Sequence, residues 1–498
     1  MKDKKVKNND KKEVKDAIIE EVAVKKDVKK TEVKEENKKS NKSLIIAVLI
    51  SLLVVSIITW FVPSGTFDGA TYTAGETVST GINEFFLSTY YSVNYYLVYL
   101  LFLVFVGIFY GVISKTKGYA KMIDKFAKFW ENKKTIFILV NSGFVALLAS
   151  VLQQPIVTVL FIPMIYSIAK KLKLSKVSTM LMTFGAMCIG IMGTTYGGYG
   201  LTYLNSSLEL TINDNLGVRF AILVLCYFIL NVFIVILNKK DNLEEVEEIY
   251  TLSESNDGKA WPYMLVFGLI FVISILGYVN FTGAFNIDVF TKFHTWLTTE
   301  VMIGETPIFG KLLGAVTAFG TWDPFVISYI LMIIILFVKL FAHIKLSELF
   351  DNAVDGMKMM VKPVCYVVLV YAMFVLCYWS GITTTILYGI NTLTVNFSPY
   401  INALGSFVSS LLHVDFEYSG FVLGAFYAAK FVDSASLITI ITAAMNGFAS
   451  LFVPTSVFMV IGLSLSNLSY SEWLKNIWKF LIALLIVLLL IFTIITFF

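Results

Sequence analysis

Long apolar runs are the feature that most limits what this chain can fold into. Runs of about 17–25 mainly apolar residues recur along the sequence, and this is the length that crosses a bilayer as a helix. Of the 498 residues, 57% are hydrophobic and only 15% are charged, against about 25% charged residues in an ordinary soluble chain. The sequence therefore predicts an all-α polytopic membrane protein, with the lipid bilayer as its surroundings.

Charge is concentrated at the N-terminus. Residues 1–43 are rich in Lys and Glu and contain no aromatic residue, a composition typical of disordered chain. A basic tail could contact nucleic acid, but mixed charge directly before the first apolar run is better explained by anchoring in the cytoplasm. We predict a cytoplasmic N-terminus, a multi-pass protein of a bacterial plasma membrane, and no nucleic-acid partner. Bacterial origin rests on the use of Lys for every basic residue except Arg219.

Lys-rich loops divide the remainder of the chain. By the excess of Lys in cytoplasmic loops, we predict a first transmembrane repeat, a cytoplasmic loop, a linking span with an outer loop, and a second repeat. Their bounds are 44–238, 239–260, 261–322 and 323–498. Within the second repeat, 343–362 is interpreted as an amphipathic cytoplasmic stretch and 363–380 as a separate span.

Two apolar segments are too short for two ordinary crossings. As a helix at ~1.5 Å per residue, 135–169 reaches ~52 Å, whereas two crossings of the hydrocarbon core need about 60 Å. A re-entrant hairpin fits better, although two minimal spans of about 17 residues are the alternative. The similarly short segment 399–430 is predicted to form a second hairpin that enters from the outer side.

The two halves repeat the same order of spans, with a hairpin followed by a broken span. "GTTYGGYG" (193–200) interrupts one span and "NGFASLFVPTS" (446–456) the other, which pairs Thr195 with Thr455. One extra span between the halves inverts the second copy in the membrane. Inverted repeats with broken helices are typical of secondary transporters, whose solute site lies near the midplane.

Polar residues at the hairpin tips and breaks are the candidate solute- or ion-binding residues. Pro155 suits the start of a second hairpin arm and Pro454 precedes the second break, although both prolines could merely kink packed helices. The candidates are Ser150, Gln153, Gln154, Thr194, Thr195, Tyr196, His413, Asp415, Glu417, Asn446, Thr455 and Ser456. No nucleophile, zinc or phosphate-loop motif stands in a suitable context, so we expect neither an enzyme nor a cofactor.

Three stretches resemble one carrier family. "TWFVPSGTFD" (59–68), "LSELFDNAVDGMK" (346–358) and "NGFASLFVPTSVFMVIGLSLSNLSYSEWLKNIWK" (446–479) resemble signatures of YfcC-type carriers, which belong with the anaerobic dicarboxylate carriers in the ion transporter superfamily. The resemblance implies a homodimer in which a transport domain moves against a scaffold. It also implies that Asn446, Thr455 and Ser456 are functional residues. The chain departs from the family at the second hairpin, where "HVDFEYSGF" replaces small polar residues.

This acidic tip has three interpretations. It could lie in the water outside the membrane, where an ionised acidic side chain costs little free energy. His413 and Glu417 could form a structural pair on one helix face. Alternatively the tip is unwound, and Asp415 or Glu417 meets a cation, a proton or a solute amine.

The function expected is secondary active transport. We expect a symporter or exchanger of the elevator type for a small carboxylate-bearing solute, most simply an amino acid and specifically basic amino-acid exchange. The alternatives are a four-carbon dicarboxylate or other organic anion, and, less well supported, a channel. Oxygen ligands at the breaks suit Na⁺ as the coupling ion, whereas His413 suits H⁺.

Overall fold

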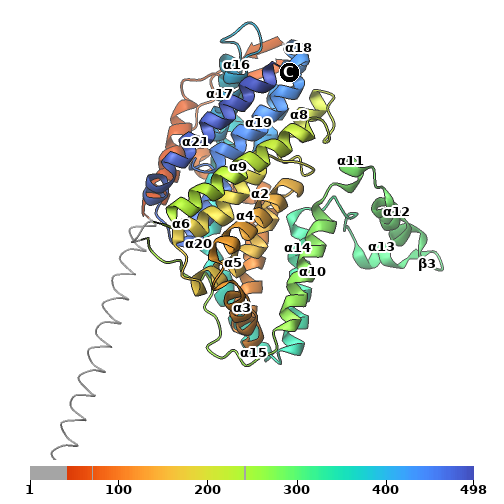
Figure 1. The fold of residues 1–498 in the computed structure, drawn as a ribbon. Coiled ribbons are helices and arrows are strands. Elements are labelled where there is room, and N and C mark those ends of the chain that lie inside the picture. The colour runs from red at the N-terminus through yellow and green to blue at the C-terminus, as the bar shows by residue number, and fades with distance from the viewer. Residues whose placement is uncertain (1–41, 70, 240–242, 498) are drawn as a thin grey trace, which may run out of the picture.

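The protein is mostly helical in the part that the structure describes. The computed structural model describes residues 42–69, 71–239 and 243–497, so nearly all of the predicted tail, 1–43, lies outside the described residues. Eight described helices are long and apolar enough to cross a membrane, as expected for an all-α polytopic membrane protein (Figure 1). They are α2 (Ile82–Ser114), α4 (Lys134–Val151), α9 (Leu216–Leu237), α10 (Trp261–Tyr278), α14 (Pro324–Phe341), α15 (Leu346–Ser380), Val432–Ser450, which includes α19 (Ala435–Ser450), and α21 (Tyr470–Thr496).

Shorter elements complete the first half of the chain. They are a helix over Lys42–Ile58, the antiparallel strands β1 (Gly65–Asp68) and β2 (Thr71–Ala74), α3 (Lys117–Trp130), the 3-10 helix η1 (Pro155–Phe161), α5 (Ile162–Lys171), α6 (Lys176–Met180), the π-helix η2 (Leu181–Gly185), α7 (Ala186–Met192) and α8 (Thr202–Ser207).

The connection between the halves and the second half contain the remaining elements. The connection holds α11 (Phe281–Phe285), α12 (Val289–Thr295), η3 (Trp296–Glu300), the paired β3 (Met302–Ile303) and β4 (Thr306–Pro307), and α13 (Ile308–Leu313). The second half adds α16 (Ile382–Asn391), α17 (Pro399–Leu412), α18 (Phe416–Lys430), η4 (Val432–Ser434) and α20 (Val457–Ser466). Residues 343–380, interpreted as a stretch and a span, lie almost entirely in the single helix α15, which contains Pro363.

The two longest helices, α2 and α15, pack side by side and run antiparallel. Tyr96 stacks on Tyr371 with 3.6 Å between ring centroids, while a Cβ on Gly111, later in α2, would lie 2.5 Å from Gly356, earlier in α15. Glycine at these positions lets the two backbones approach closely. Because α2 and α15 hold equivalent places in the two halves, their opposite directions are those expected of inverted repeats.

Each half also places one hairpin arm beside its broken span. In the first half, the hydroxyl of Thr195 donates to the carbonyl of Ser150 at 3.3 Å. In the second, the hydroxyl of Thr455 donates to the carbonyl of Ser410 at 2.5 Å, across the same separation of 45 residues. The expected pairing of Thr195 with Thr455 therefore corresponds to a contact that occurs in both halves.

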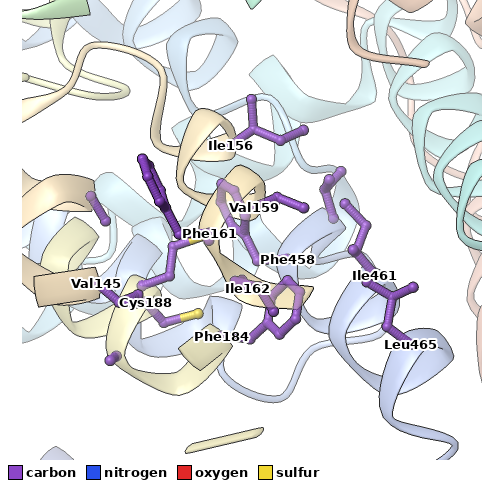
Figure 2. Close-up of a cluster of buried hydrophobic side chains, with 14 of the residues drawn as sticks. Val145, Ile156, Val159, Phe161, Ile162, Phe184, Cys188, Phe458, Ile461 and Leu465 are labelled. Atoms are coloured by element: carbon purple, nitrogen blue, oxygen red, sulfur yellow. The ribbon is translucent and has the colours of Figure 1, made fainter. Parts of the chain in front are cut away.

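A continuous apolar core joins the halves. Figure 2 shows buried side chains of the first hairpin, such as Ile156 and Ile162, next to Phe184 of the first broken span and Phe458 and Ile461 of the second. These side chains are almost fully buried, and between helices in a membrane such contacts are stabilised by close packing rather than by removal from water. The core holds the two hairpin tips in a defined relation to each other.

Candidate functional site

The tips of both predicted hairpins line one cavity of about 220 Å³. The first hairpin contributes Gln153 and Gln154, and the second contributes Asp415 and Glu417. The other walls come from α2, α15, the first break and the start of α8, namely Tyr96, Tyr99, Tyr371, Gly197, Gly198, Tyr199, Gly200 and Thr202, together with Val414 and Phe416 of the second tip.

The first tip is a three-residue interruption between α4 and η1. Gln154 is not helical, with φ −120° and ψ 83°, in keeping with the steric clash that disfavours the helical region for a residue before proline. Pro155 then begins η1, as the sequence indicated for the second arm. Gln153 donates from its backbone to Tyr278 at 2.9 Å and from its side chain to Gly320 at 2.5 Å. The tip is thus attached to the far end of α10.

The second tip is unwound between α17 and α18, and Asp415 is the last residue of this interruption. Its Oδ1 accepts a hydrogen bond of 3.2 Å from the backbone of Tyr418 and so caps α18. Its Oδ2 accepts a hydrogen bond of 2.8 Å from the hydroxyl of Tyr96. Tyr96 interrupts the helical geometry of α2, with φ −113° and ψ 18°. The carboxylate therefore links a helix cap to a kink in α2.

Glu417 joins the second tip to the end of the first break. Its two carboxylate oxygens accept from the backbone N–H groups of Thr202, at 3.3 Å, and Tyr203, at 3.2 Å. These are the first two residues of α8. Since an ionised carboxylate accepts about four hydrogen bonds, both Asp415 and Glu417 retain acceptor capacity toward the cavity.

The carboxyl groups in this cavity have no cationic partner among the described residues that line it. None of the described residues that line it is Lys, Arg or His. Over the same described part of the chain, neither Asp415 nor Glu417 forms an ion pair. Four tyrosines also line the space, and the rings of two of them, Tyr96 and Tyr371, are stacked on each other. The cavity is therefore suited to a positively charged group.

His413 does not take part in this cavity. Its side chain is fully buried between the rings of Phe374 and Tyr418, with centroids at 5.8 Å and 5.5 Å. Neither ring nitrogen has a hydrogen-bond partner among the described residues. The structural pair of His413 with Glu417 is not formed, because His413 precedes α18 and Glu417 bonds to α8.

The residues expected at the first break hold its backbone rather than line the cavity. The Oγ of Ser150 donates to the carbonyl of Gly193 at 2.8 Å and accepts from the backbone of Thr195 at 3.0 Å. Thr194 accepts from the backbone N–H of Tyr199, which lines the cavity, at 3.2 Å. Tyr196 packs instead on Phe285, with ring centroids 4.5 Å apart.

The second break lies at a different, much smaller cavity of about 10 Å³. Asn446 lines it, and its Oδ1 accepts from Ser410 at 3.0 Å. Thr455 bonds to the same Ser410, and Ser456 caps α20 by accepting from Met459 at 3.3 Å. The four predicted polar patches are therefore not gathered in a single cavity.

Sequence reasoning missed the tyrosines and Arg219. Tyr96 and Tyr99 lie three positions apart on α2 and share a face, but an aromatic residue in an apolar helix is not a specific signal. The structure also brings a cationic side chain to the first break. Arg219 of α9 is buried and donates to the carbonyl of Thr195 at 3.3 Å and to that of Asp214 at 3.1 Å.

Comparisons with known proteins add only distant likeness. No protein-family model and no curated protein sequence matches the chain. Among solved structures, the YdaH transporter of Alcanivorax borkumensis is similar at a TM-score of 0.42 and 12% identity, over 91% of this chain and 98% of that one. MtrF of Neisseria gonorrhoeae, described with a class of antimetabolite efflux pumps, is similar at 0.36 and 14% identity, over 91% and 94%. Likeness at this level does not establish a shared fold or function, and the resemblance to YfcC-type carriers stays a prediction.

Proposed function

We propose that this protein is a secondary transporter whose solute carries an amine, most simply a basic amino acid taken up in exchange for another. The observation that supports this most directly is the pair of carboxylates, Asp415 and Glu417, facing a cavity without a cationic side chain among its described lining residues. A charge-assisted hydrogen bond from an ammonium group to such a carboxylate contributes about 1.5–3 kcal/mol. The cavity volume of about 220 Å³ suits a small metabolite, since drug-sized ligands occupy about 300–1,000 Å³.

The arrangement of broken elements supports transport by alternating access. Unwound backbone within a membrane protein is tolerated where it is enclosed by protein or lines a water-filled cavity. Here two interrupted hairpins and a glycine-rich break meet at one cavity, which is the arrangement of discontinuous elements found at solute sites of transporters. Elevator-type movement, a homodimer, a Na⁺ or H⁺ coupling step and a plasma-membrane location are parts of the same proposal.

A dicarboxylate is the less favoured solute. Two carboxylates on the solute would be repelled by Asp415 and Glu417, because like charges in a partly buried site interact more strongly than in water. Arg219 is a candidate for compensation because it contacts the first break, but it does not line this cavity and its described hydrogen bonds go to backbone carbonyls. The amino acid therefore remains the better-supported solute.

Transport by purified protein in liposomes tests this proposal. We expect liposomes loaded with unlabelled lysine to take up labelled lysine or arginine, with saturation and trans-stimulation that a channel would not show. The variants Asp415→Asn and Glu417→Gln should each lower this exchange at least about tenfold. Asp433→Asn, an exposed acid beyond the same hairpin, is the matched control and should exchange normally. Uptake of succinate without uptake of any amino acid would overturn the proposal.

A further inference from the structure

A second, larger cavity lies at the Lys-rich end of the molecule. Its volume is about 570 Å³, and it lies between the start of α3, the start of α10, the end of α14 and the start of α15. None of the residues predicted to bind the solute lines it. These four elements meet at the lower end of the helices in Figure 1, whereas α16 and α18 lie at the upper end.

The polar part of this cavity is basic. Lys115, Lys117 and Lys259 line it together with His343, and Glu348 is the only acid among its described lining residues. Lys117 is paired with Asp257 at 3.2 Å, and this pair is mostly exposed. The described part of the chain provides no ion pair for Lys115 or Lys259. Two amines are therefore available to an anion without breaking an existing ion pair.

Backbone groups strengthen the positive potential. Helix α10 begins at this cavity with Pro262, which has no N–H group, in its first turn. Helix α3 also begins here, and it has no side-chain cap. The first N–H groups of such a helix carry a partial positive charge and favour an anion, a phosphate in particular. Gly118 in the first turn of α3 and Gly258 just before α10 lie close together, since a Cβ on Gly258 would lie 2.5 Å from the backbone nitrogen of Gly118.

The other wall of the cavity is apolar and reaches the outer surface. Trp261 is 63% exposed and Phe341 39% exposed, although both line the cavity. Tryptophan at the end of a membrane helix is typical of the interface between headgroups and acyl chains. The outer surfaces of α10 and α14 continue this wall with exposed Leu265, Leu340 and Phe337. A ligand that carries both a phosphate and acyl chains would contact both walls.

We propose that this cavity binds the headgroup of an anionic phospholipid from the bilayer. The phosphate lies among Lys115, Lys259 and the start of α3, and the acyl chains lie along α10 and α14. The shared chemistry is that of a phosphate anion, and a soluble phosphate would satisfy only the basic half of the cavity. Basic pockets between membrane helices on the cytoplasmic side bind lipid headgroups of this kind. The site does not depend on the identity of the transported solute.

Native mass spectrometry of the full-length protein in detergent tests the site without any variant. We expect phosphatidylglycerol to remain bound in preference to phosphatidylcholine with the same acyl chains, and glycerol 3-phosphate not to compete at equal concentration. Equal retention of the two lipids would overturn the proposal. Competition by glycerol 3-phosphate at that concentration would overturn the lipid assignment in favour of a soluble phosphate.

Charge-removing variants distinguish this cavity from general surface attraction. The variant Lys115→Gln with Lys259→Gln should lose most of the preference for phosphatidylglycerol, a fall of at least about tenfold in relative retention. Lys125→Gln with Lys128→Gln removes the same charge from exposed positions of α3 that do not line the cavity, and it should behave as the unaltered protein. An equal fall in both variants would contradict a built site. Lys259→Gln alone serves if the double variant does not fold.

Discussion

The hydroxyl of Tyr96 donates a hydrogen bond of 2.8 Å to the carboxylate of Asp415. This bond joins the interrupted turn of α2 to the tip of the second hairpin, elements more than half the chain apart. Tyr96 is also stacked on Tyr371 of α15, so the carboxylate is oriented by the contact between the two antiparallel helices. The amine of the proposed solute would therefore bind a carboxylate whose position depends on both halves of the protein.

Removing that hydroxyl should weaken solute binding without loss of fold. Tyr96→Phe keeps the stacked ring but leaves Asp415 without this donor, and a hydrogen bond to a charged group contributes about 1.5–3 kcal/mol. We expect the KM for lysine exchange to rise about tenfold or more. Tyr400→Phe is the control, because its hydroxyl bonds to Thr493 at an exposed position away from the cavity. Normal KM in the Tyr96 variant would show that the bond does not position the carboxylate.

The close approach of α2 and α15 predicts a strong effect of a single methyl group. Gly111→Ala would place its Cβ 2.5 Å from Gly356, and overpacking of this kind costs typically about 1–3 kcal/mol. Thermal unfolding in detergent should therefore occur at lower temperature. Gly268→Ala adds the same methyl group to α10, where nothing lies within 4 Å, and it should not lower the unfolding temperature. Equal temperatures for the two variants would contradict the helix contact.

The equivalent hairpin serines should be important for stability in both halves. Ser150→Ala leaves the backbone at the first break without its side-chain partner, and Ser410→Ala does the same to Asn446. A buried polar group left unsatisfied costs about 1–3 kcal/mol. We expect each variant to unfold at lower temperature in detergent, whereas Ser347→Ala, at an exposed position, should not. A loss in only one half would show that the two serine side chains are not equally important for stability.

Much of the fold follows from local patterns. The lengths of the apolar runs predict the spans, because a helix satisfies its own backbone in lipid, and the short segment before Pro155 predicts the first interruption. The predicted stretch 343–362 and the predicted span 363–380 share one helix, because α15 continues through Pro363. A proline in a membrane helix need not end it when neighbouring helices satisfy the freed carbonyl, and no local pattern reveals those neighbours.

The candidate site was less predictable than the fold. Asp415 and Glu417 are conspicuous because charge is costly at membrane depth, and both line the cavity that the structure shows. Tyr371 and Tyr199 are not conspicuous, because their presence in the cavity depends on contacts between distant segments. For the same reason the sequence offered no means of separating the site of Asp415 from the smaller cavity at Asn446.

Binding of lysine and norleucine to the purified protein tests the central claim most directly. The two amino acids have side chains of the same carbon skeleton, but only lysine carries the second amine. Isothermal titration calorimetry in detergent should show lysine binding at least about tenfold more tightly than norleucine, and Asp415→Asn should remove that difference. Equal affinity for the two amino acids would contradict the assignment of Asp415 and Glu417 to the side-chain amine of a basic amino acid, and tighter binding of succinate than of lysine would contradict their assignment to any cationic group.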